Sequence, residues 1–219
     1  GDGGVNSGLP ERGVSIVEVT GAGTALELQS LSLATPDGSR TLFRDVSLSV
    51  AQGEHLLIMG VSGAGKSSLL RAIAGLWDRG AGSIGRPPRD QLVFLPQRPY
   101  CTIDTLRKQV LYPLPPEAAA HVTEEALLGA LAAVQLGALA RRLGGLDAVR
   151  DWGDMLSLGE QQRLAFARLL VSQPKLAILD EATSALDLQN EAAMYRALAG
   201  VPELTIVSVG HRPSLLRYH

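Results

Sequence analysis

GVSGAGKS, at residues 60–67, is the stretch that decides the fold of this chain. It fits the spacing G-x-x-x-x-G-K-[ST], and it lies between an apolar, strand-like run at residues 55–59 and a helix-like run at residues 68–74. Glycines let the backbone curl so that successive N–H groups face a polyphosphate, and the following helix adds the positive end of its dipole. This context predicts a phosphate-binding loop rather than a glycine-rich turn with a surface lysine.

Two side chains of the loop are expected to do the chemistry of phosphate binding. The Lys66 ammonium is expected to reach the β- and γ-phosphates of a nucleotide, and the Ser67 hydroxyl to ligate Mg²⁺. The residues predicted to bind nucleotide in this stretch are Gly60, Val61, Ser62, Gly63, Ala64, Gly65, Lys66, Ser67 and Ser68.

Composition limits what the rest of the chain can be. With 219 residues the chain can form one large domain, or a core with a small attached subdomain. A formal net charge of −2 gives no overall basic field and argues against nucleic acid as the main partner. The longest apolar stretch, residues 126–140, is too short and too interrupted to span a bilayer. Because the chain begins without methionine and stops at His219 without a closing element, we expect a piece of a longer polypeptide.

The order of apolar patterns predicts an α/β domain with a largely parallel sheet. Residues 1–23 are rich in glycine and small polar residues and are interpreted as a linker before a domain at 24–219. A proline-broken, alanine-rich region at about 98–153, mainly 102–149, is interpreted as a helical insert. Strands are expected at residues 25–33, 42–50, 55–59, 91–95, 176–179 and 204–209, helices at 68–74, 160–171 and 188–198, and turn residues at 78–85.

Two carboxylates end the apolar run LAILDE at residues 176–181. Asp180, at the strand tip, is placed to hold Mg²⁺ through its water shell, and Glu181 to polarise an attacking water. By itself the pair could equally be solvated acids at a strand end. A phosphate-binding loop in the same chain favours the catalytic interpretation.

A hydroxyl and a glycine precede the helical pattern that starts at Glu160. Ser157 and Gly159 could form a second anion site from helix N-terminal N–H groups, or they could simply cap the helix. By itself, the sequence of this segment favours the helix-cap interpretation over an anion site. His211 follows the last predicted strand, where ligands of open α/β sheets gather.

Five motifs in this order and spacing resemble the nucleotide-binding domain of ABC transporters. They are GVSGAGKSS (60–68), FLPQRPY (94–100), LSLGEQQR (156–163), LAILDEATSALD (176–187) and SVGH (208–211). The resemblance covers residues 26–211, and the detailed sequence in and around the motifs is similar to subfamily D. That group includes peroxisomal fatty-acyl-CoA transporters, the lysosomal cobalamin transporter, and bacterial relatives that take up cobalamin or peptides. The resemblance implies a P-loop NTPase fold with a mainly parallel central sheet, an antiparallel β subdomain and a helical insert subdomain.

The resemblance also implies roles for residues around a bound ATP. Ser67 and Gln97 correspond to Mg²⁺ ligands, and Gln97 also to the sensor of a membrane domain. Asp180 corresponds to an acid that holds the magnesium water shell. Glu181 corresponds to the general base and His211 to the γ-phosphate switch, so Glu181, His211 and Gln97 form the implied catalytic set.

In the family, two such domains dimerise head to tail, and each ATP lies between the phosphate loop of one and the signature of the other. Ser157 and Gly159 then correspond to contacts with the partner's ATP, and Asp187 lies in the stretch that links the two sites. The expected partners are a second copy of the domain and a transmembrane domain, fused N-terminally. The expected location is the cytosolic face of a bacterial inner membrane or an organelle membrane, with this domain peripheral by itself.

The chain departs from the family pattern near both half-sites. Thr35 stands where an aromatic ring usually stacks on adenine, and Phe43 is a candidate to replace it. Leu158 stands where glycine is usual, and Glu160 where glutamine is common.

Three alternatives remain open at this point. One is a soluble ABC-type ATPase that acts on nucleic acid or ribosomes, which predicts tandem cassettes, a coiled coil or basic patches. Another is a simple P-loop kinase or GTPase, which would not use a signature serine. Within the transporter class, an importer subunit that docks on a separate permease is the third.

Overall fold

A four-stranded parallel sheet forms the centre of the computed structural model, which describes residues 13–18 and 23–219. In spatial order its strands are β4 (His55–Ile58), β10 (Thr205–Val209), β9 (Leu176–Asp180) and β6 (Leu92–Leu95). Every pairing is parallel, and β9 and β10 are buried at each position, as a sheet covered on both faces requires. The predicted parallel central sheet is therefore confirmed.

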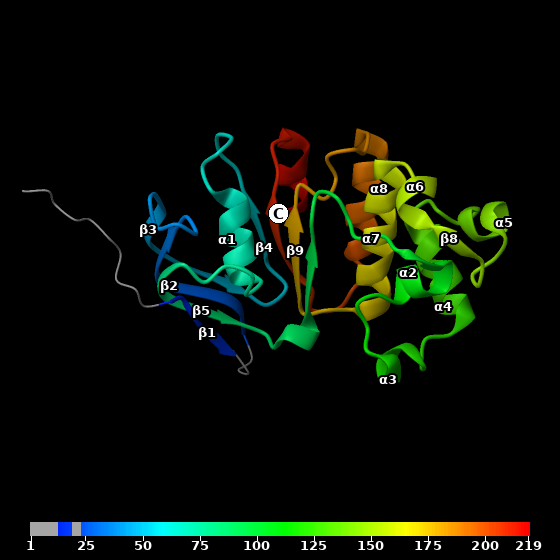
Figure 1. Cartoon of the computed structure of the whole chain (residues 1–219), viewed down its shortest axis with the longest axis horizontal. Helices are drawn as coiled ribbons and strands as arrows, with labels where there is room; N and C mark the ends of the chain where they lie inside the picture. Colours follow the sequence, from blue (N-terminus) through cyan, green and yellow to red (C-terminus); the bar gives the residue numbers. More distant parts are fainter. Residues whose placement is uncertain (1–12, 19–22) are drawn as a thin grey trace, which may run out of the picture.

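Helices cover both faces of this sheet. Helix α1 (Lys66–Ile73) lies on one face, and α7 (Leu158–Ser172) and α8 (Leu188–Leu198) lie on the other (Figure 1). A short 3₁₀ helix, η1 (Arg89–Gln91), leads into β6, and another, η2 (Pro213–Tyr218), follows β10.

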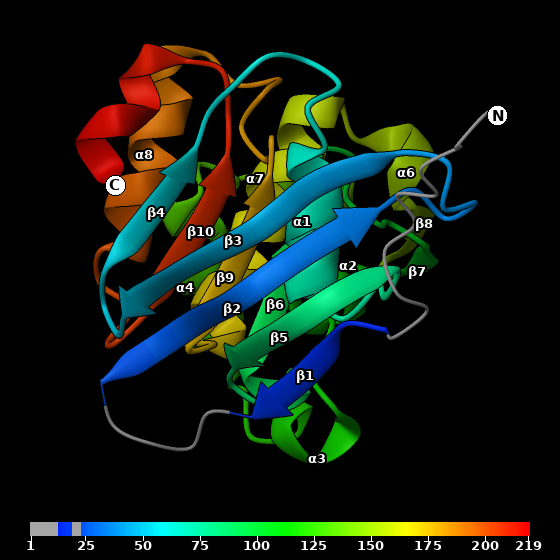
Figure 2. The same cartoon turned by 90° about the vertical axis from the view of Figure 1, so that its left-hand side faces the viewer.

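A second sheet lies on the far side of α1 (Figures 1 and 2). Its order is β1 (Ser15–Glu18), β5 (Gly80–Arg86), β2 (Thr24–Ala34) and β3 (Thr41–Ala51). Strand β2 is antiparallel to both neighbours, whereas β1 runs parallel to β5. The antiparallel β subdomain is confirmed, with one parallel pair at its edge.

Two segments differ from the prediction. Residues 15–18, expected in the linker, form β1, and residues 80–86, expected mostly as turn, form β5. The glycines that suggest a turn in β5 instead allow a close approach, because a Cβ on Gly82 would lie 2.5 Å from the carbonyl oxygen of Ser30 on β2. Of the other residues of the predicted linker, 1–12 and 19–22 lie outside the described residues.

The predicted helical insert forms a layer against α7. It contains α2 (Leu106–Leu111), α3 (Pro116–Ala119), α4 (Glu124–Ala133), α5 (Leu139–Leu143) and α6 (Trp152–Met155). It also holds a short antiparallel ribbon, β7 (Ile103–Thr105) with β8 (Val149–Asp151), which the sequence pattern did not predict. Helices α2 and α4 make the main contacts with α7.

Two apolar clusters fix these layers. One joins the insert to the central sheet around Trp152 and Phe166, both fully buried, and the other surrounds α1 with residues such as Leu26, Leu70 and Ile84. In the part of the chain that the structure describes, no helix combines the length and the apolar character needed to cross a membrane.

Two glycines test whether β5 depends on close backbone approach. Gly82→Ala should lower the free energy of unfolding by about 1–3 kcal/mol, because its φ of 96° disfavours a side chain and the Cβ meets β2. Gly129→Ala, in the interior of α4 with nothing within 4 Å of the new Cβ, should raise it by about 0.5–1 kcal/mol. Denaturant titration measures both, and effects of the same sign would contradict the placement of β5.

Candidate nucleotide-binding site

The phosphate loop connects β4 to α1, and its shape depends on Gly65. This residue has φ 89° and caps α1. A Cβ at Gly65 would lie 3.1 Å from the Phe43 ring and 3.2 Å from Leu42, so the loop rests against β3. The first helical bond runs from Leu69 N–H to the Gly65 carbonyl at 3.0 Å, and no side chain caps the helix. The N–H groups of residues 66–68 therefore precede the helical ladder and can receive an anion.

Lys66 folds over this loop. Its Nζ donates to the carbonyl oxygens of Gly60 at 2.9 Å and Val61 at 2.8 Å, and the residue is only 8% exposed. Within residues 13–18 and 23–219, no carboxylate forms an ion pair with it. A buried ammonium without a counter-charge, beside helix N–H groups, fits a polyphosphate ligand.

Ser67 and Asp180 meet beside the loop. The Ser67 hydroxyl donates to Asp180 Oδ1 at 2.8 Å, and Asp180, the last residue of β9, is 7% exposed. Hard oxygen donors of this kind suit Mg²⁺, which keeps several of its waters when bound to proteins.

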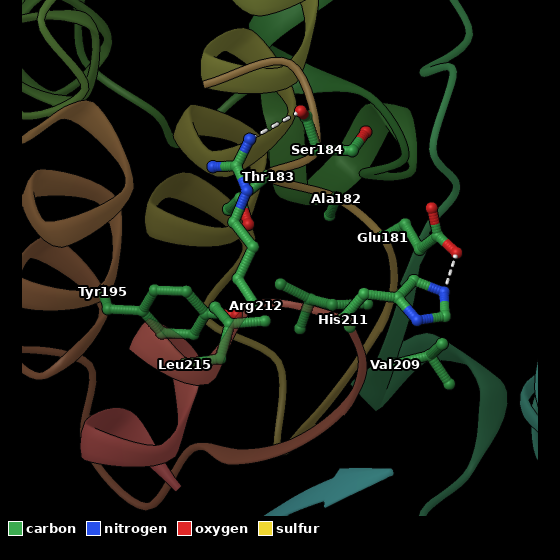
Figure 3. A pocket seen from close by; sticks show the side chains of 11 residues that line it. Glu181, Ala182, Thr183, Ser184, Tyr195, Val209, His211, Arg212 and Leu215 are labelled. Carbon is green, nitrogen blue, oxygen red and sulfur yellow. Dashed lines mark hydrogen bonds and ion pairs between the residues drawn. The ribbon is translucent and has the colours of Figure 1, made fainter. Parts of the chain in front are cut away.

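Glu181 is held between two nitrogen atoms. His211 Nε2 lies 3.0 Å from its Oε1, and Gln97 Nε2 donates to its Oε2 at 3.1 Å. The backbone of Glu181 has φ 51°, and its N–H donates to the carbonyl oxygen of Val209 at 3.0 Å. Figure 3 shows the His211 ring directed at the carboxylate. The structure thus brings together the three residues predicted as the catalytic set, from the ends of β6, β9 and β10.

A cavity of about 170 Å³ adjoins this group. Its lining is mainly apolar, with Tyr195 and Leu215 opposite His211 (Figure 3). Burial raises the pKa of Tyr195 to about 12, so its phenol stays neutral.

Residues that follow Glu181 are fixed by two side chains that the sequence pattern did not single out. Arg212 donates to the carbonyl oxygen of Ser184 at 2.9 Å (Figure 3) and to that of Leu186 at 2.6 Å. From α7, the fully buried Gln162 accepts from Ala185 N–H at 3.0 Å. The only sequence signals for these two residues are their positions, beside His211 and inside the LSLGEQQR segment.

Gln162 also reaches the strand end that carries Gln97. Its Nε2 donates to the Gln97 carbonyl oxygen at 2.8 Å and to the Ser184 hydroxyl at 3.1 Å. One buried amide therefore links α7, the end of β6 and the segment at residues 184–186.

Ser157 is the N-cap of α7. Its hydroxyl accepts from Glu160 N–H at 3.2 Å, while Glu160 Oε2 accepts from Ser157 N–H at 3.0 Å, which completes a capping box. A Cβ on Gly159 would lie 3.3 Å from the Ala185 carbonyl oxygen, so the first turn packs on residues 184–186. The helix-cap interpretation of Ser157 is confirmed, and its contact with an anion stays a prediction.

The loop, Ser67 and Asp180 meet at the carboxyl edge of a parallel sheet, which defines a P-loop nucleotide-binding protein. The ABC transporter family matches residues 43–184, more than half of the chain. The chain belongs to this family, as one of its ATP-binding domains.

Relatives and a solved structure agree with this assignment. The uncharacterized ABC transporter ATP-binding protein sll0182 of Synechocystis is 54% identical over 203 residues, covering 93% of this chain and 30% of that protein. ABC transporter D family member 2, chloroplastic, of Arabidopsis thaliana is 43% identical over 236 residues, covering 89% and 33%. A bacterial Atm1-family ABC exporter with ATP bound superposes with a TM-score of 0.77 at 27% identity, covering 91% of this chain and 36% of that one.

The chain therefore spans about a third of the length of these relatives. The resemblance to subfamily D is confirmed by the Arabidopsis relative. The matched family and relatives are transporters or their ATP-binding proteins, so they do not support the soluble alternative.

Lys66→Ala should weaken ATP binding by about 10- to 100-fold, because the buried ammonium is the loop's own counter-charge for phosphate. Lys175→Ala removes an exposed lysine just before β9, at the opposite edge of the sheet, and should leave affinity unchanged. Titration with ATP followed by calorimetry checks both variants. Unchanged affinity in Lys66→Ala would remove this loop from the nucleotide site.

Proposed function

We propose that this chain binds and hydrolyses Mg-ATP as the module that powers substrate transport across a membrane, with two copies closing head to tail on two nucleotides. The observation that carries the proposal is the carboxylate of Glu181, held by His211 and Gln97 beside the phosphate loop. Family membership makes ATP hydrolysis the expected reaction.

The proposed roles follow from the contacts. Lys66 and the N–H groups of residues 66–68 would hold the phosphates, while Ser67 and Gln97, and Asp180 through water, would hold Mg²⁺. Bound Mg²⁺ supplies charge neutralisation at the phosphates. Glu181 accepts a proton from the attacking water.

Gln97 and His211 orient the general base. Each occupies one oxygen of the Glu181 carboxylate, so its direction is set before nucleotide binds. In this proposal His211 also faces the γ-phosphate and reports its presence. A change at Glu181 would be transmitted to α7, the helix that Ser157 caps. Gln97 binds Glu181, and Gln162 of α7 binds the Gln97 carbonyl oxygen.

Ser157 and Gly159 would complete the site of a second copy. All hydrogen bonds of the Ser157 side chain within the described residues stay in its own helix, with Glu160. In this proposal the phosphate loop and this helix start contribute to separate half-sites, and a head-to-tail dimer joins each to its complement.

The remaining two thirds of the relatives' length leave room for the membrane part. We propose a transmembrane domain fused N-terminally, with this domain peripheral at the cytosolic face of the membrane. The net charge of −2 agrees with a partner other than nucleic acid.

Glu181→Gln should lower ATP turnover by about 10²–10⁴-fold, because the amide cannot accept the proton, and should leave ATP affinity intact. Glu203→Gln, an exposed change before β10 at the opposite edge of the sheet, is the matched control. Phosphate release measures turnover in both. Turnover of Glu181→Gln within fivefold of wild type would exclude Glu181 as the base.

Ser157→Ala should spare ATP binding by the single chain but block ATP-driven dimerisation, since the proposed contact with the partner's nucleotide is lost. Because it also removes a helix cap, Thr123→Ala is the control: Thr123 caps α4 in the same way, accepting from Ala126 N–H at 3.2 Å. Each loses about 1 kcal/mol of stability. Sedimentation with Mg-ATP should separate them, and equal dimerisation would make Ser157 a cap only.

A further inference from the structure

An ion pair joins the helical insert to the start of α7. Arg142, on α5, donates from its Nη2 to Glu160 Oε1 at 2.7 Å. The Glu160 side chain is 17% exposed, and that of Arg142 is 55% exposed.

The two carboxylate oxygens of Glu160 have different partners. Oε2 accepts from the Ser157 N–H at 3.0 Å and from its hydroxyl at 3.1 Å, whereas Oε1 accepts from Arg142. Burial raises the pKa of Glu160, but the hydrogen bonds from Arg142 and Ser157 outweigh it and hold the pKa below its usual value. The carboxylate is therefore charged at neutral pH.

This charge lies where an anion is expected. If the Ser157 hydroxyl contacts the partner's ATP, a carboxylate 3.1 Å from that hydroxyl repels the phosphates and competes for the same proton. A positive charge on the other carboxylate oxygen would reduce this repulsion. Arg142 is the side chain that supplies a positive charge directly to Glu160.

We propose that Arg142 is a positioning residue of the second nucleotide half-site, where it neutralises Glu160 so that Ser157 can donate to the ATP of the partner subunit. The inference rests on the proposed function. Arg142 binds the oxygen that Ser157 does not use, draws negative charge toward Oε1, and weakens Oε2 as an acceptor for the hydroxyl.

A consequence is that two layers of the fold build this half-site. Ser157 and Glu160 belong to α7, but the compensating charge belongs to α5 of the insert. A shift of α5 relative to α7 that breaks the pair would lower the affinity of the half-site for nucleotide without a change at the phosphate loop.

The test uses the Glu181→Gln chain, in which bound ATP is expected to persist, and measures by sedimentation the Mg-ATP concentration that gives half dimerisation. Adding Arg142→Ala should raise this concentration about five- to twentyfold, the effect of one partly exposed charge. Adding Arg141→Ala, which removes the neighbouring exposed arginine, should change it by less than about twofold. Arg142→Lys should bring the Mg-ATP concentration at half dimerisation most of the way back to that of the Glu181→Gln chain, because lysine keeps the positive charge.

A double-mutant cycle distinguishes charge compensation from mere packing. In the Glu160→Gln background, where no charge needs neutralising, Arg142→Ala should have less than about a twofold effect. An equal effect in both backgrounds, or no effect in the Glu160 chain, would overturn the inference. Loss of the ion pair should lower the thermal stability of the monomer similarly with or without ATP, whereas ATP titration of the monomer should be unchanged by Arg142→Ala.

The outcomes also separate the inference from the proposed function. If Glu181→Gln dimerises with Mg-ATP and Arg142→Ala does not alter the midpoint, the inference alone fails. If Glu181→Gln stays monomeric at every ATP concentration, the head-to-tail proposal fails. The proposed role of Arg142 then fails as well, because it depends on that dimer.

Discussion

The parallel register of the central sheet is the constraint on which the site depends. Because β4, β10 and β9 run in the same direction, their carboxyl ends lie at one edge, and the phosphate loop, His211 and Glu181 follow those three ends. The hydrogen bond from Glu181 N–H to the Val209 carbonyl ties two of these ends directly. A slip of either strand by one residue would reverse the direction of its side chains and separate the base from His211.

The same edge is connected to α7 by a short chain of partly buried hydrogen bonds. Gln162 binds the backbone of both Gln97 and Ala185, and Arg212 fixes the carbonyl oxygens on either side of Ala185. The proposed catalytic group and the helix that would face the partner's nucleotide are therefore both joined to the segment at residues 184–186. In the proposed function, closure on ATP and opening after hydrolysis would act as a two-state change, because packed elements shift between discrete arrangements.

The sequence predicted the parts whose geometry is local. Motif spacing alone predicted a phosphate loop before a helix and two carboxylates at a strand end, although α1 begins at Lys66 rather than at residue 68. The alternation of strand and helix patterns predicted the parallel sheet. Strand β5 was predicted as turn because its glycines weaken every strand signal, although contact with β2 requires them. Arg212 and Arg142 could not be found, because their partners lie 18 or more positions away and only tertiary packing brings them together.

The central claim is that each complete site uses the phosphate loop of one copy and the signature helix of the other. Mixing Lys66→Ala and Ser157→Ala chains tests it most directly, since each variant alone lacks one half of every site. The account predicts that the mixture recovers ATP turnover, up to roughly a quarter of the wild-type rate, because half of randomly formed dimers are mixed and each holds one intact site. A mixture that stays as inactive as either folded variant would contradict it.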